Sequence, residues 1–167
     1  MTQFKPPLFK TILFATAMFL VTQLYSQNYI YKGTQQIPST STWRFTTSGG
    51  ISGSLEVTVA KSRTNAYMML AIDVPVPQFA ISGSVYLILQ NGNMIVLNSR
   101  VAKDHVDNQS KVLFNISSAN YTLLQKNDIM KIRFTIGDSM MKTKENYTAN
   151  NEYSKYSTAI EINALKD

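Results

Sequence analysis

The stretch SLEVTVA, residues 54–60, decides the fold class of this chain. Its apolar side chains, Leu55, Val57 and Val59, alternate with polar ones. This alternation predicts a β-strand with one wet face, because successive side chains leave a strand on opposite sides. The same period recurs in TWRFTT (42–47), KVLFNI (111–116), KIRFTI (131–136) and STAIEIN (157–163).

Two further segments, AYMMLAIDV (66–74) and VYLIL (85–89), are apolar on both faces. Such runs are typical of central strands that are covered on both sides. VYLIL is followed by Asn91 and Gly92 and then by a second apolar run, MIVLNS (94–99). An Asn-Gly pair in this position predicts a β-hairpin, because a type I′ turn needs positive φ at both central residues.

Two later stretches interrupt the strand pattern. In SSANYTLLQKND (117–128), Ser117 or Ser118 can cap a single helical turn that packs over one end of the sheets. Residues 137–156 are polar and rich in Asn, Lys and Tyr. We therefore expect a long polar loop there, before a last strand at 157–163.

The pattern predicts an all-β domain of about eight strands, joined by turns and with scarcely any helix. We expect a two-sheet antiparallel β-sandwich of the immunoglobulin-like or jelly-roll kind, with Trp43 in its core. A small closed barrel is the alternative, because its strands show the same alternation.

The N-terminus predicts a secretory signal peptide over residues 1–26. Lys5 and Lys10 precede an apolar run, TILFATAMFLV (11–21), and Ser26 is a small residue at the expected cut. A transmembrane helix needs about 20 apolar residues, roughly twice this run; a buried N-terminal helix is the alternative. We expect export through the Sec-type pathway and a single mature domain, residues 27–167.

The composition of the chain restricts the cellular location and the classes of partner that we expect. The chain has no cysteine, which excludes disulfides and thiolate chemistry and favours a bacterial envelope, periplasmic or extracellular. Its formal net charge is +6, but the basic residues are spread singly along the chain. Nucleic-acid-binding proteins concentrate them, so we expect no nucleic-acid partner. No apolar stretch after the signal is long enough to span a bilayer.

The stretch KDHVDN (103–108) holds the only histidine of the chain. Asp104, His105, Asp107 and Asn108 are ligand types that suit zinc, calcium or manganese. However, no second His or any Cys completes a transition-metal site, and the spacing does not match a calcium loop. Because Asp and Asn favour turns, the sequence predicts a structural polar turn and neither a metal nor a cofactor.

Catalysis is not expected. A Ser-His-Asp triad would have to use His105, and no serine lies in a G-x-S-x-G elbow. Asp73, at the end of an apolar strand, is the one carboxylate whose burial would suggest chemistry. We therefore predict a protein that is not an enzyme, with a small hydrolase as the least favoured alternative.

A binding role remains, with two candidate partners. The first is another envelope protein, bound through sheet edges or loops by an accessory or structural module. The second is a glycan, stacked on the tyrosines of the polar loop, Tyr147, Tyr153 and Tyr156. Four N-x-[ST] sequons and the tripeptide Asp138-Ser139-Met140 are glycosylation signals of low specificity.

Overall fold

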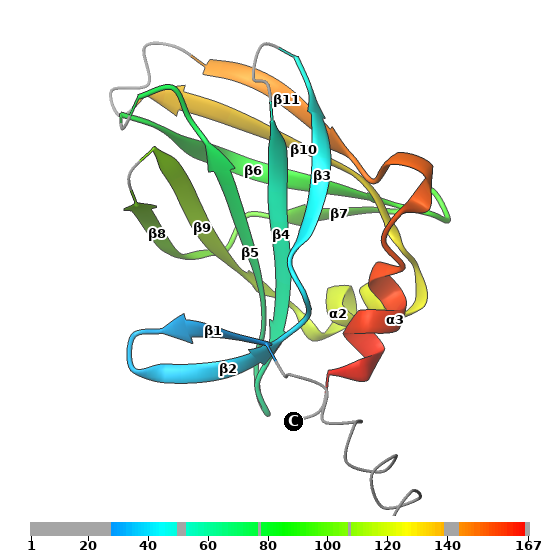
Figure 1. The fold of residues 1–167 in the computed structure, drawn as a ribbon. Coiled ribbons are helices and arrows are strands. Elements are labelled where there is room, and N and C mark those ends of the chain that lie inside the picture. Colours follow the sequence, from blue (N-terminus) through cyan, green and yellow to red (C-terminus); the bar gives the residue numbers. More distant parts are fainter. Residues whose placement is uncertain (1–27, 50–52, 77, 107, 139–143, 166–167) are drawn as a thin grey trace, which may run out of the picture.

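The structure is a computed structural model that describes residues 28–49, 53–76, 78–106, 108–138 and 144–165 (Figure 1). The expected signal peptide, Asp107 and Ser139 lie outside these residues. The described elements are, in order, β1 (Asn28–Lys32), β2 (Gln35–Ser39), β3 (Trp43–Ser48), β4 (Ser54–Lys61), β5 (Ala66–Asp73), β6 (Phe79–Leu89), β7 (Met94–Leu97), β8 (Arg100–Val106), β9 (Gln109–Ile116), α2 (Ser118–Lys126), β10 (Ile129–Asp138), β11 (Lys144–Asn150), the 3₁₀ helix η1 (Glu152–Ser154) and α3 (Thr158–Ala164).

All described strands belong to one antiparallel sheet, which curls until it is nearly closed into a barrel (Figure 1). The strand order is β7-β6-β10-β11-β3-β4-β5-β9-β8, and the β1–β2 hairpin is attached to β4. The all-β prediction is confirmed. The sandwich of about eight strands is not, because alternation fixes one buried face for each strand but not whether the sheet folds over or curls round.

The two ends of the sheet path approach one another across β6 and β9. The backbone N–H of Ile81 in β6 donates to the buried Ser110 hydroxyl of β9, at 3.2 Å. The Arg100 guanidinium of β8 donates to the Gly83 carbonyl of β6, at 3.4 Å. Side chains therefore supply hydrogen bonds that link β6 to β9 and to β8 at the seam of the barrel.

The inward positions of the strands form the main core. Trp43 and Phe45 of β3 are fully buried, as predicted, and lie in one cluster with Phe114 and Leu124. A smaller cluster lies outside the barrel wall, under the β1–β2 hairpin; it comprises Ile30, Ile37, Ala60, Tyr67 and Leu113. This second cluster covers the outer face of β5, which explains why its sequence is apolar on both sides.

The predicted β6–β7 hairpin is present, but with a different turn. Gly92 has a φ of 83°, and its N–H donates to the Leu89 carbonyl at 2.9 Å. Asn91 does not have the positive φ that a type I′ turn would require. The loop is thus a three-residue turn ending in a left-handed glycine, and not type I′.

Helices close one end of the barrel (Figure 1). The predicted helical turn is the nine-residue α2, whose Ser117 N-cap accepts from the Asn120 N–H at 3.3 Å. The prediction of a strand at 157–163 is wrong, because the segment forms α3, which packs beside α2. Ile162 is buried in the core while Ile160 is 70% exposed, so the two isoleucines do not share a face as a strand requires. No described helix is long and apolar enough to cross a bilayer.

The loop expected over 137–156 contains strand β11, which pairs with β10 and β3. Its buried positions are Tyr147 and Ala149, and polar side chains occupy the alternate positions. Tyr and Ala are weak apolar markers, so the period was hidden in the sequence.

Glu161 of α3 binds the start of β3 through hydrogen bonds. Its carboxylate accepts from the Trp43 indole N–H at 2.9 Å and from the Ser41 hydroxyl at 2.5 Å. A buried indole N–H without an acceptor costs about 1–3 kcal/mol.

We therefore expect Glu161→Ala to lower the free energy of unfolding by about that amount in urea titrations. The control is Glu152→Ala, an exposed carboxylate of η1, which should change it by less than about 0.5 kcal/mol.

Candidate functional site

The expected polar turn at 104–108 is mostly strand. Asp104 and His105 lie in β8, and the chain reverses only after Val106. The Asp104 carboxylate accepts from the His105 backbone N–H at 2.8 Å, and the Asn108 carbonyl accepts from the Val74 N–H at 2.7 Å. No group of three or more His, Cys, Asp or Glu in the described part of the chain could hold a metal ion.

Asp73 is exposed at the end of β5. Its carboxylate accepts a long hydrogen bond from the Gln109 side-chain amide, at 3.4 Å. The structure thus places it in the water-facing position of a strand end, away from the barrel core.

The structure does not bring the three loop tyrosines together. Tyr147 is buried in the core and stacks on Phe134, with ring centroids 5.8 Å apart. Tyr156 is half-buried and stacks on Phe45, at 6.1 Å. Tyr153 is fully exposed on η1 with a φ of 54°. They therefore form no shared aromatic surface.

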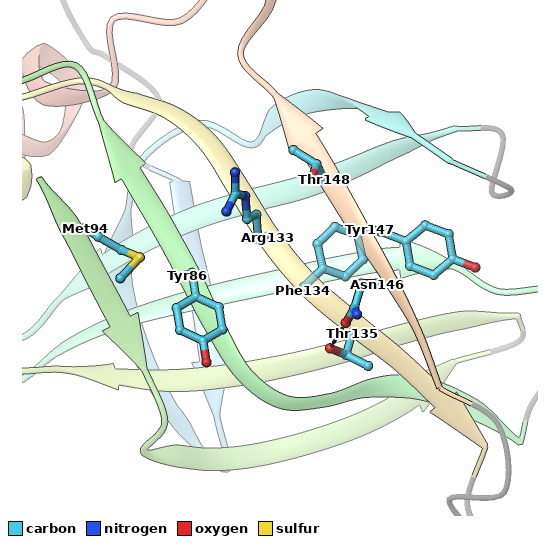
Figure 2. Close-up of a pocket in the computed structure, with 8 residues that line it drawn as sticks. All are labelled: Tyr86, Met94, Arg133, Phe134, Thr135, Asn146, Tyr147 and Thr148. Carbon is cyan, nitrogen blue, oxygen red and sulfur yellow. Dashed lines mark hydrogen bonds between the residues drawn. The ribbon is translucent and has the colours of Figure 1, made fainter. Parts of the chain in front are cut away.

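A hollow of about 390 Å³ lies on the sheet formed by β7, β6, β10 and β11 (Figure 2). This volume is within the range of small-molecule sites, about 300–1,000 Å³. The lining residues are Tyr86, Met94, Arg133, Phe134, Thr135, Asn146, Tyr147 and Thr148. We call it the Tyr86 hollow.

Strand register builds the hollow. Tyr86 of β6 is directly opposite Arg133 of β10, which is opposite Thr148 of β11. Paired residues of neighbouring antiparallel strands project to the same face, with Cβ atoms about 4.5–5.5 Å apart. Tyr86 is 39% exposed, whereas its neighbours Val85 and Leu87 point into the core. Tyr86 and Arg133 therefore project from the same outer surface, although the ring and the guanidinium extend in different directions along it (Figure 2).

Hydrogen bonding orients the polar part of the hollow. The Thr135 hydroxyl and the Asn146 side-chain oxygen form a bond of 2.8 Å, which is drawn in Figure 2. Because the Asn146 oxygen accepts this bond, its NH₂ group is left to donate elsewhere. The hollow thus offers an exposed ring, a guanidinium and an oriented amide, all on strands.

Tyr86 was missed as a functional residue because VYLIL reads as apolar on both faces. The structure covers only the inner face of this part of β6. A usable signal was the tyrosine itself, whose polar tip favours a position at an apolar–water boundary. Lys131, Arg133 and Thr135 were already predicted to face outward, but nothing in the sequence showed that β6 pairs with β10.

Strand β8 is one edge of the sheet, and all its residues except His105 are exposed. Three features guard it against pairing with another strand. These are the charge of Lys103, a register shift between Arg100 and Ala102, and the Asp104 carboxylate bound to the His105 N–H.

The Tyr147 hydroxyl donates a hydrogen bond to the Glu145 carboxylate, and burial together with this carboxylate raises the pKa of Tyr147 to about 12. An unfolded tyrosine has a pKa of about 10, so the folded state holds the proton more tightly. This contribution to stability is complete below pH ~10 and is lost as the pH rises towards 12.

We therefore expect Tyr147 to contribute a late step, near pH 12, in a tyrosinate absorbance titration of the protein. Tyr147→Phe should remove it and weaken the fall in stability between pH ~10 and 12. Tyr153→Phe, which removes an exposed ring hydroxyl, should leave the late step in place. A late step that survives Tyr147→Phe would contradict the assignment.

Comparison of the chain with family models, curated proteins and solved structures finds no match. The functional argument therefore depends on the geometry of the Tyr86 hollow and of the β8 edge.

Proposed function

We propose that this protein is an exported, non-catalytic module that binds carbohydrate in the Tyr86 hollow. The observation that carries the proposal is the exposed Tyr86 ring in one hollow with the Arg133 guanidinium and the oriented Asn146 amide. An aromatic ring can stack on the apolar face of a pyranose, while nearby donors bind its hydroxyl groups. The site shares Tyr147 and Asn146 with the Tyr-rich loop expected from the sequence, but its exposed ring is Tyr86.

Rigidity supports a binding role for the hollow. Tyr86 and Arg133 are on long strands paired on both sides, so little conformational entropy is lost when a ligand binds. None of the described lining residues is acidic, so the carboxylate pair of a glycosidase has no counterpart in this hollow. These points favour recognition over hydrolysis.

Export is supported by the N-terminal pattern. Lys5 and Lys10 followed by the short apolar run are the parts of a Sec-type signal. A periplasmic or extracellular location would bring the mature domain into contact with envelope or environmental polysaccharides.

We expect Tyr86→Ala to weaken glycan binding at least tenfold, because stacking area is lost. A glycan array with the mature chain would identify ligands, and titration calorimetry would measure the dissociation constants. The control is Tyr31→Ala, which removes a tyrosine that is 71% exposed on the β1–β2 hairpin, outside the hollow. Equal loss of affinity in both variants, or none in either, would contradict the site.

A second candidate function is a protein-binding accessory module that uses the β8 edge. Its support is a seven-residue edge strand whose side chains are exposed on both faces. An extended segment of a partner could add to this edge if the Asp104 carboxylate moved away from the His105 N–H.

Removal of the Asp104 carboxylate tests this second candidate function. We expect Asp104→Ala to strengthen capture of an envelope partner several-fold, because the His105 N–H becomes available for a ladder bond. Quantitative pull-downs from the native host's envelope, with Asp73→Ala as the matched control, would measure it. Unchanged recovery of every protein in the Asp104→Ala sample would count against the edge.

A further inference from the structure

We infer that the Tyr86 hollow selects acidic saccharides, with Arg133 binding the carboxylate of a uronic acid residue stacked on Tyr86. This inference rests on the proposed function and names its substrate class. It is carried by the charge around the hollow, which is an observation independent of the aromatic ring.

Arg133 has no carboxylate partner among the residues that the structure describes. The only salt bridge found there joins Arg44 of β3 to Glu56 of β4, at 3.1 Å. Both residues lie on the outer face of the sheet, like Arg133, so the contrast is between two exposed guanidiniums in similar settings. Arg44 is neutralised by its cross-strand neighbour, whereas the cross-strand neighbours of Arg133 are the uncharged Tyr86 and Thr148.

The surroundings of Arg133 are positive. Strands β6 and β7 contain no acidic residue. The acids of β10 and β11 are Asp138 and Glu145, whose positions alternate with the outward ones, and Glu145 accepts the Tyr147 hydroxyl. Lys131, two residues from Arg133, is exposed on the same face of β10. The charge around the hollow therefore favours an anion.

The arrangement suits a carboxylated sugar better than a simple anion. A guanidinium binds a carboxylate through two parallel hydrogen bonds, and its planar fork fixes the orientation of the bound group. Tyr86 lies within one cross-strand spacing, so one uronic acid residue can touch both side chains. The amide of Asn146 and the hydroxyl of Thr148 are then placed to bind ring hydroxyls.

The test uses a uronic acid oligosaccharide and its carboxyl-reduced neutral counterpart, each titrated into the mature chain by calorimetry. We expect the wild type to bind the acidic form at least tenfold more tightly, with an affinity that falls as salt rises. Arg133→Gln should make the two affinities equal, and Arg133→Lys should keep part of the difference because the charge remains. Arg63→Gln, an equal charge change in the β4–β5 turn, is the control.

The outcomes separate this inference from the proposed function. Equal binding of the two sugars by the wild type, with loss of both in Tyr86→Ala, would overturn the acidic preference and leave the glycan site standing. Binding of polyglutamate as tightly as the uronic acid oligosaccharide would overturn the assignment to a saccharide. Failure of the wild type to bind any glycan on the array would overturn both.

Discussion

The antiparallel ladder between β6 and β10 is the interaction on which the rest of the structure depends. It pairs Phe79–Leu89 with Ile129–Asp138, two segments separated by the hairpins and helix between them. Its register has one shift at the start of β10 and one in the middle of the pairing, between Arg133 and Thr135, and such irregularities increase local bending and twist. Gly83, with a φ of 70°, lies in one of them, in a conformation that L side chains rarely adopt. The same ladder curves the sheet towards closure and places Tyr86 beside Arg133.

Much of the fold could be predicted because alternation reports directly on which side chains are buried. KIRFTI and SLEVTVA became strands β10 and β4, and Trp43 is in the core. The α3 segment was predicted wrongly, because Ile160 and Ile162 alternate with Glu161 as in a strand although the segment forms a helix. Its helical form depends on Asp128, whose carboxylate accepts from the Ala159 N–H at 2.9 Å, a contact across 31 residues. Closure into a barrel depends on pairings equally distant in sequence.

The candidate site was less predictable than the fold. Aromatic recognition was expected, but on tyrosines whose positions turned out to be set by packing: Tyr147 stacks on Phe134 and Tyr156 on Phe45. Tyr86 became visible only when the strand order put a polar strand, β10, on one side of β6 and the short β7 on the other. A site formed from one residue on each of several strands has no local motif, since its members are brought together by register alone.

The bond between Trp43 and Glu161 joins residues 118 positions apart. During synthesis, the Trp43 indole therefore lacks its acceptor until almost the whole domain has emerged. Contacts of such long sequence separation form late, because the entropy of closing the loop must be overcome first. The barrel thus has a topology of high contact order, and the contacts of helix α3 are among the last to form. The core of the barrel therefore closes only after nearly all of the described chain is available.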